Sequence, residues 1–213
     1  MKVLAINGSP RKKHNTGLLL EWALAGAASK GATTELIHLK DYRYTGCLSC
    51  FACKKIGGSS YGRCAVKDEL TPILEKAHEA EALVIGSPIY LSTESAFARA
   101  FLERLGFQYI LYSKIKGPLS PKKKGVALVY AMNISEDLLE PSGTGAVIKV
   151  TKSLMERLFA PCEVLLSCDT LQFDDYSAYD TDMWDSAAKR RRREEVFPLE
   201  LEKAFAIGQR LAG

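Results

Sequence analysis

Apolar runs of strand length alternate along the chain with segments of helical periodicity. Five runs have the pattern of strands, over residues 3–7, 34–39, 82–85, 125–131 and 163–167. Apolar positions recur at helical spacing in the segments that follow, over residues 18–29, 68–77, 95–104, 144–159 and 186–211. Because strand and helix patterns alternate, the chain is predicted to be an α/β protein.

The first and third strands are each followed by Gly-Ser-Pro, at residues 8–10 and 86–88. In an open parallel sheet, ligands bind beyond the carboxyl ends of strands, where the strand order reverses. Right-handed crossovers place helices on both faces of such a sheet. We therefore predict a three-layer, flavodoxin-like fold with a five-stranded parallel sheet in the order 2-1-3-4-5.

The chain shows no internal repeat and no linker that would divide it. We expect a single domain over residues 1–213, with a cysteine-rich loop, residues 41–67, inserted after the second strand. That loop is rich in Cys, Gly, Ser and Tyr and carries no regular periodicity.

The turn over residues 9–17 has the composition of a phosphate site. It contains three cations and directly precedes a helix, whose first N–H groups are unpaired and favour an anion. Ser9, Asn15 and Thr16 can add side-chain donors, and Arg11 can add a charge-assisted hydrogen bond. The chain lacks both the Walker pattern and Gly-x-Gly-x-x-Gly, so the usual nucleotide fingerprints are absent. A surface loop with a Ser or Asn helix cap is the alternative interpretation.

The segment after the third strand suits a planar ring. Pro88, Ile89, Tyr90 and Leu91 offer a rigid apolar edge and an aromatic face, and Ser92 adds a hydroxyl beside it. Backbone N–H groups there can bond the polar edge of an isoalloxazine. Ordinary packing of Tyr90, in the core or at the entry to the next helix, is the alternative.

Composition narrows the class of protein. The chain has 213 residues, of which 47% are hydrophobic and 25% charged, values typical of soluble globular proteins. No apolar run approaches the ~20 residues that a membrane span needs, and the chain opens on a strand rather than a secretory signal. We therefore expect a cytoplasmic protein with no membrane partner.

The charge pattern argues against nucleic acid. The net charge is only +4, and the basic clusters at residues 122–124 and 189–193 contain no interleaved aromatics. Residues 190–193 run directly into Glu194 and Glu195, which favours a solvated helix face with local ion pairs. A contact with a polyanion or a nucleotide phosphate is the alternative for this run.

Together, the two turns resemble those of the NAD(P)H-dependent FMN reductase and iron–sulfur flavoprotein group of the flavodoxin-like superfamily. The resemblance covers roughly the first half of the chain, on Gly8-Ser9-Pro10-Arg11 with Asn15-Thr16 and on Gly86-Ser87-Pro88-Ile89-Tyr90. It implies that the FMN phosphate is held by Ser9, Arg11, Asn15 and Thr16. It also implies that the flavin ring is lined by Pro88, Ile89, Tyr90, Leu91 and Ser92, and is approached from the other side by Met132 and Asn133. The group's usual assembly implies a homodimer or homotetramer.

Four of the six cysteines gather in the loop after the second strand: Cys47, Cys50, Cys53 and Cys64. Without a secretion signal they do not indicate a disulfide framework. The iron–sulfur members of the group carry a compact four-cysteine motif upstream of an acidic pair, here Asp68-Glu69, although their last gap is shorter. The spacing suits a 4Fe–4S cluster, and it also allows four-thiolate zinc or unligated thiols, including a redox pair of Cys47 and Cys50.

The leading hypothesis is an FMN-dependent oxidoreductase. It would pass electrons from NAD(P)H, the co-substrate, through the flavin to a small acceptor such as a quinone, a nitro or azo compound, or free flavin. Two alternatives stay open: an iron–sulfur flavoprotein that relays electrons between a ferredoxin-like partner and FMN, and a non-enzymatic flavin-binding module.

No side chain is assigned a catalytic role, because hydride chemistry belongs to the flavin and needs no protein acid or base. His14, His38 and His78 are scattered, and we expect them to be surface or packing residues. Ser9 and Ser87 do not lie in a Gly-x-Ser-x-Gly elbow, which argues against a hydrolase.

Overall fold

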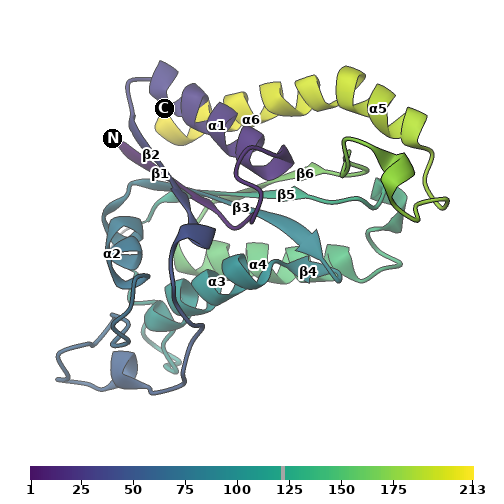
Figure 1. Cartoon of the computed structure of the whole chain (residues 1–213). Coiled ribbons are helices and arrows are strands. Elements are labelled where there is room, and N and C mark those ends of the chain that lie inside the picture. Colours follow the sequence, from purple (N-terminus) through teal and green to yellow (C-terminus); the bar gives the residue numbers. More distant parts are fainter. Residues whose placement is uncertain (121–122) are drawn as a thin grey trace.

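The computed structural model describes residues 1–120 and 123–213 and has one parallel sheet between two layers of helices (Figure 1). Lys122, in the basic cluster expected at 122–124, lies outside the described residues. The strands are β1 (Lys2–Asn7), β2 (Thr33–His38), β3 (Ala82–Tyr90), β4 (Thr93–Glu94), β5 (Gly125–Ala131) and β6 (Cys162–Ser167). The α-helices are α1 (Asn15–Ser29), α2 (Thr71–Glu79), α3 (Ala96–Tyr109), α4 (Thr144–Leu158), α5 (Ser186–Glu195) and α6 (Phe197–Ala212).

The parallel strands lie in the order β2-β1-β3-β5-β6, and β4 pairs antiparallel with β3. The predicted fold class is therefore confirmed. The strand labels differ from the expected 2-1-3-4-5 because the sheet has six strands. The two-residue β4, which the sequence did not indicate, precedes the last two parallel strands in the chain.

Strand β3 is longer than predicted. The sequence placed a turn at residues 86–88, but the strand continues through Tyr90. Its pairing with β1 ends at Asn7–Gly86, while its pairing with β5 continues to Pro88–Ala131. Pro88, which has no N–H, therefore lies where β3 no longer needs to pair with β1. The prediction of a second turn was wrong, and the ring-binding segment is instead a strand that extends past its neighbour.

The C-terminal helix is also not the single element predicted over 186–211. It divides into α5 and α6 at Val196. Pro198 stands in the first turn of α6, where its missing N–H costs nothing, but it would break an uninterrupted helix. The break turns α5 toward the carboxyl ends of the strands (Figure 1).

Alternating residues of β1 face two separate cores. Leu4 and Ile6 belong to a core shared with α2, α3 and α4, whereas Val3 and Ala5 pack with α1 and α6. Strand β1 is thus buried on both faces. A ligand can reach it only at its carboxyl end. Within the described ranges, no helix is long and apolar enough to cross a membrane.

Candidate functional site

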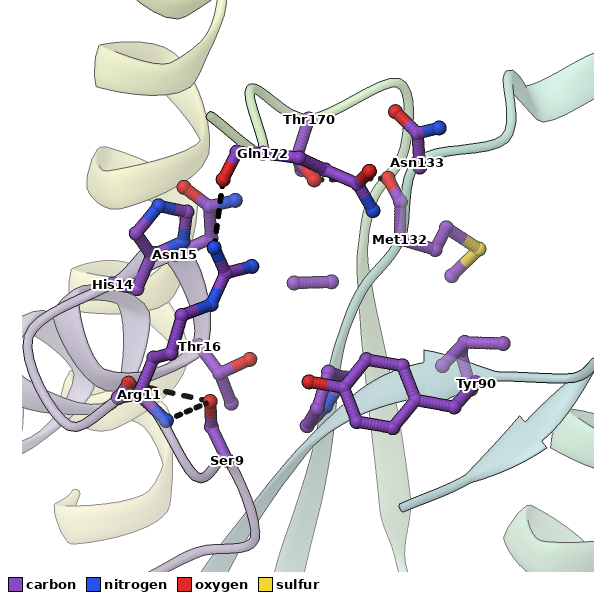
Figure 2. A pocket seen from close by; sticks show the side chains of 13 residues that line it. Ser9, Arg11, His14, Asn15, Thr16, Tyr90, Met132, Asn133, Thr170 and Gln172 are labelled. Atoms are coloured by element: carbon purple, nitrogen blue, oxygen red, sulfur yellow. Dashed lines mark hydrogen bonds between the residues drawn. The ribbon is translucent and has the colours of Figure 1, made fainter. Parts of the chain in front are cut away.

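A pocket opens at the carboxyl ends of β1, β3 and β5 and encloses about 320 Å³, counting the part open to solvent (Figure 2). The residues that line it are Ser9, Arg11, His14, Asn15, Thr16, Pro88, Ile89, Tyr90, Ala131, Met132, Asn133, Thr170 and Gln172.

Most of the predicted cofactor-binding residues meet in this pocket. The exceptions are Leu91 and Ser92, which form the tip of the hairpin between β3 and β4 and lie outside the lining. Both have positive φ, 49° and 62°, and Leu91 is 99% exposed. The structure therefore does not support the part of the ring-binding assignment that extends beyond Tyr90.

The first turn is fixed by its own short hydrogen bonds. The Ser9 amide donates to Asn7 Oδ1 at 2.8 Å, and Ser9 Oγ accepts from the Arg11 amide at 3.1 Å. His14 is the N-cap of α1 but makes no side-chain cap hydrogen bond, and the first turn of α1 holds no acidic residue. The amide end of α1 therefore meets the pocket uncapped, with its positive end available to an anion.

The loop after β6 closes the pocket over this turn. Arg11 Nη1 donates to the Gln172 carbonyl at 2.7 Å (Figure 2). Asn15 Nδ2 donates to the Leu171 carbonyl at 3.0 Å. Thr170 Oγ1 donates to the Met132 carbonyl at 3.1 Å and so ties this loop to the one after β5. Ala131, Thr170 and Gln172 were not predicted, because no motif marks the end of β5 or the loop after β6.

His14 is a pocket residue rather than the surface or packing residue expected. Burial, followed by the positive charges of Arg11 and Arg193, lowers its pKa to about 4, so the imidazole is neutral near pH 7. Its place between Arg11 and Asn15 in the first turn was a signal that could have identified it. The low pKa thus reflects burial first and the two nearby positive charges second.

Tyr90 borders the pocket opposite the first turn. Its ring points toward Ser9 and Thr16 in Figure 2, and its side chain remains 42% exposed. The hairpin that carries it is anchored by Glu94, whose buried carboxylate accepts from Tyr130 Oη at 3.1 Å and from Thr151 Oγ1 at 2.6 Å. Tyr90 is therefore an exposed aromatic on a fixed support.

The basic run at 189–193 is not the solvated helix face that was predicted. Lys189 is buried, and its Nζ donates to the Asn133 carbonyl at 2.9 Å and to Asn133 Oδ1 at 2.7 Å, while also pairing with Asp169. Arg192 pairs with the buried Glu200. The two residues between Lys189 and Arg192 are exposed. One side of α5 thus braces the loops after β5 and β6 that line the pocket.

The four clustered cysteines line a second cavity, also of about 320 Å³ with its open part, against the later turns of α3. Cys53 is buried, Cys47 and Cys64 are half-buried, and Cys50 is exposed. Burial is the main cause that raises the pKa of Cys53. The rest of the lining is Leu48, Phe51, Ala65, Val66, Arg104, Phe107 and Gln108.

Two side chains of α3, Arg104 and Gln108, bring N–H donors to this cavity. Arg104 Nε donates to Cys64 Sγ at 3.3 Å, and Gln108 Nε2 is buried without a hydrogen-bond partner. An orphaned buried N–H is costly, and an acceptor inside the cavity would satisfy it. The helix predicted over residues 68–77 begins only after Leu70, so Asp68 lies outside it and pairs with Arg104 at 2.5 Å.

A single metal ion does not fit this arrangement. Among the described residues, no group of three or more His, Cys, Asp or Glu side chains converges closely enough to hold one ion. A tetrahedral zinc needs four sulfurs within about 2.3 Å of one point. A cluster binds each thiolate at a different iron, so its ligands stand further apart around a shared volume. The four thiols share one cavity among the described residues, and the predicted 4Fe–4S cluster stays a prediction.

Comparison with known proteins identifies a family model and several relatives that match part of the chain. A model of the family described as NADPH-dependent FMN reductase matches residues 1–136. An iron-sulfur flavoprotein of Methanocaldococcus jannaschii is 37% identical over 125 residues, which cover 56% of this chain and 61% of the relative. An iron-sulfur flavoprotein of Archaeoglobus fulgidus is 42% identical over 104 residues, 49% of this chain and 48% of the relative. The chain thus spans about half to three fifths of the length of these relatives.

A solved structure shares the fold over nearly the whole chain. The NAD(P)H:quinone oxidoreductase from Methanothermobacter marburgensis superposes with a TM-score of 0.70 at 16% identity and covers 99% of this chain and 98% of its own. At that identity the likeness bears on the fold alone.

Proposed function

The chain belongs to the NADPH-dependent FMN reductase family, and from this premise we propose that it is an FMN-dependent oxidoreductase whose cofactor occupies the pocket at the carboxyl edge. When bound there, FMN supplies the transfer of hydride and electrons. The residues of the chain bind the cofactor, orient it and leave it accessible to a small acceptor.

The phosphate end lies at the first turn. Ser9 and Thr16 offer hydroxyls, Arg11 and Asn15 offer N–H donors, and α1 presents its uncapped amide end. Arg11 and Asn15 already donate to carbonyls of the loop after β6, so both side chains are held in place at the pocket wall. Charge and preset donors together favour a phosphate group here.

The ring end lies along β3. Pro88 and Ile89 supply a rigid apolar edge, Tyr90 supplies an aromatic side chain, and Met132 stands on the opposite wall. Because Tyr90 remains 42% exposed, this side of the pocket is open to NAD(P)H and to a small electron acceptor. No side-chain acid or base is needed for that transfer.

One observation carries the proposal. Two segments far apart in the sequence, residues 9–16 and 88–90, line one pocket with opposite chemistry at its two ends. FMN has a charged phosphate at one end and a flat, largely apolar ring at the other. A molecule with only one of these features would leave half of the pocket unused.

Titration with FMN, followed by quenching of flavin fluorescence, tests the binding. We expect Asn15→Ala combined with Thr16→Ala to weaken FMN affinity by roughly 10-fold to 100-fold, since two hydrogen bonds to a charged group are lost. Lys13→Ala is the control, because this exposed cation belongs to the same turn but lies outside the pocket lining. Unchanged affinity in the double variant would remove the phosphate assignment.

Activity is tested by anaerobic bleaching of the bound flavin with NADPH and with NADH. Rapid bleaching supports the reductase. A chain that binds FMN but is bleached by neither would instead be a non-enzymatic flavin-binding module. The assembly expected from the resemblance, a homodimer or homotetramer, stays a prediction for sedimentation analysis.

The cysteine cavity favours a second candidate, an electron relay that includes a 4Fe–4S cluster. Cys47, Cys50, Cys53 and Cys64 would hold the cluster, while Arg104 and Gln108 would donate to its sulfurs. The relatives named iron-sulfur flavoprotein are consistent with this proposal. A ferredoxin-like protein would then be the partner that supplies electrons.

Iron and acid-labile sulfide, measured on protein prepared without oxygen, decide between the two candidates. The relay requires close to four of each per chain and their loss in Cys53→Ser. Cys168→Ser is the matched control, a buried cysteine outside the cavity. A preparation free of iron that still binds FMN and is bleached by NADPH would leave the simple reductase.

A further inference from the structure

Arg193 lies behind the lining of the pocket and contacts Asn15 at its phosphate end, from a part of the chain that the family match does not cover. The match ends at residue 136, and Arg193 lies in α5. Its Nη1 donates to Asn15 Oδ1 at 2.9 Å. The same Asn15 side chain donates its Nδ2 to the Leu171 carbonyl, so both ends of the amide are engaged.

The guanidinium of Arg193 is held by stacking. It lies 3.9 Å from the centroid of the Phe197 ring, and Phe197 is itself buried. An arginine fixed against an aromatic face loses little further freedom when it binds an anion. The contact with Phe197 therefore holds the positive charge of Arg193 in a fixed position.

The charge of Arg193 is not neutralised as those of its helix neighbours are. Lys189 pairs with Asp169 and Arg192 pairs with Glu200. In the part of the chain that the structure describes, neither Arg193 nor Arg11 has a carboxylate within ion-pair distance. Two guanidiniums that form no ion pair therefore flank the amide end of α1. Burial is the largest cause of the low pKa of His14, and the charges of Arg11 and Arg193 lower it further, opposed by Asp174.

We propose that Arg193 is a second guanidinium of the phosphate site, which orients Asn15 and selects the phosphorylated flavin over uncharged riboflavin. This inference rests on the proposed function. The positive charge acts on a dianionic phosphate and has little to act on in riboflavin, whose ring and ribityl chain are neutral. Helix α5 thus sets which form of the flavin the pocket accepts.

The test is the ratio of FMN to riboflavin affinity, measured by fluorescence titration of the full chain. Arg193→Gln should weaken FMN by roughly 10-fold to 100-fold and leave riboflavin within about twofold. Arg193→Lys, which keeps the charge but not the planar stack, should recover part of the loss. The control is Arg191→Gln, an exposed arginine of the same helix that stands 4.0 Å from Asp185.

A second measurement needs no flavin. NMR titration of His14 should show its pKa rising from about 4 in Arg193→Gln, because one of the two repelling charges is removed. An equal loss of FMN and riboflavin affinity, or an unchanged ratio, overturns the inference while FMN binding by the unaltered chain stands. Failure of the unaltered chain to bind FMN removes the proposed function as well.

Discussion

The pocket at the carboxyl edge and the cavity behind the cysteines enclose similar volumes, but different structure surrounds them. The pocket is framed by strand ends and by α1, and its polar side chains already hydrogen-bond to the backbone. The cavity is formed by the irregular loop over 41–67 against α3, with thiols and apolar side chains as its wall. The loop lies at the opposite side of the fold from the α5 end of the sheet (Figure 1).

The difference shows how each site obtains its order. In the pocket, Arg11 and Asn15 are fixed by carbonyls of the chain before a ligand enters. In the cavity, Gln108 Nε2 has no partner among the described residues, and Arg104 is one of several side chains that tie the loop to α3. A site with satisfied donors is organised by the fold, whereas a site with an orphaned donor still needs its occupant.

The largest effect should come from a matched pair of glycine variants. A Cβ at Gly17 would stand 1.8 Å from the Lys12 carbonyl oxygen, so Gly17→Ala must open the first turn. We expect a loss of about 3–4 kcal/mol in the free energy of unfolding, together with loss of FMN binding. Gly57, in the cysteine loop, has a φ of 73° and nothing within 4 Å of its Cβ position. Gly57→Ala should cost about 1 kcal/mol and leave FMN affinity unchanged.

Chemical denaturation and FMN titration of both variants check this pair. Equal losses in the free energy of unfolding would contradict this prediction. Gly17 is needed because the Lys12 carbonyl lies so close, whereas Gly57 is needed only for its positive φ. Loss of FMN binding in Gly57→Ala would show that the loop and the pocket are coupled rather than independent.

Removal of Arg104 should damage the cavity alone. This buried guanidinium pairs with Asp68, and its Nη2 donates to the Val66 carbonyl at 3.0 Å. Arg104→Met leaves Asp68 without its partner, so we expect a loss of about 2–4 kcal/mol in the free energy of unfolding. Maleimide labelling of Cys53 and Cys64 should become faster, with FMN affinity within about twofold of the unaltered chain.

Arg157→Met is the control for the loss of Arg104, because it makes the same chemical change at an exposed position in α4. It should change neither stability by more than about 0.5 kcal/mol nor thiol labelling. If Arg104→Met weakened FMN by tenfold, the two sites would share one supporting element, and α3 would be that element.

The sequence revealed the pocket more fully than the cavity, for a physical reason. Ser9 follows β1 and Tyr90 ends β3, both strands with local periodicity, and parallel strands bring their carboxyl ends together in any crossover fold. Gln172 and Arg193 come from segments without a motif, and only the packing of the loop after β6 and of α5 places them. Pro198 was a readable signal for the break between α5 and α6. The contacts of Arg104 with the cysteine loop depend on tertiary packing that no spacing encodes.

The free energy of unfolding should depend on pH through His14, a residue of the pocket lining. His14 has a pKa of about 4 in the folded chain, against 6.5 when unperturbed. As the pH falls from 6.5 to 4, the unfolded chain takes up the proton first, so the free energy of unfolding decreases across that window. The contribution is about 1–2 kcal/mol, less than the full shift would give, because the imidazole is only half-buried and water screens the two arginines.

Denaturation of the unaltered chain and of His14→Gln at pH 7.5 and pH 4.5 measures this contribution. The difference between the two proteins should shrink or reverse at the lower pH, because the variant no longer has the group that titrates. Other histidines shift both proteins equally and cancel. A constant difference would mean that burial and the charges of Arg11 and Arg193 do not hold His14 neutral in the folded chain.

The smallest effect concerns the hairpin tip and decides whether it belongs to the pocket. Leu91 and Ser92 form a two-residue turn with positive φ at both positions, a geometry that favours Asn and Gly. Leu91→Asn should raise the free energy of unfolding by about 0.5–1 kcal/mol. Ile115→Asn is the control, since Ile115 is 95% exposed and its φ is not positive. The resemblance assigns Leu91 to the flavin ring, whereas the structure places it outside the pocket. FMN affinity that is unchanged in Leu91→Asn would therefore end the ring-binding segment at Tyr90, and a loss of fivefold or more would show that the hairpin closes on the bound ring.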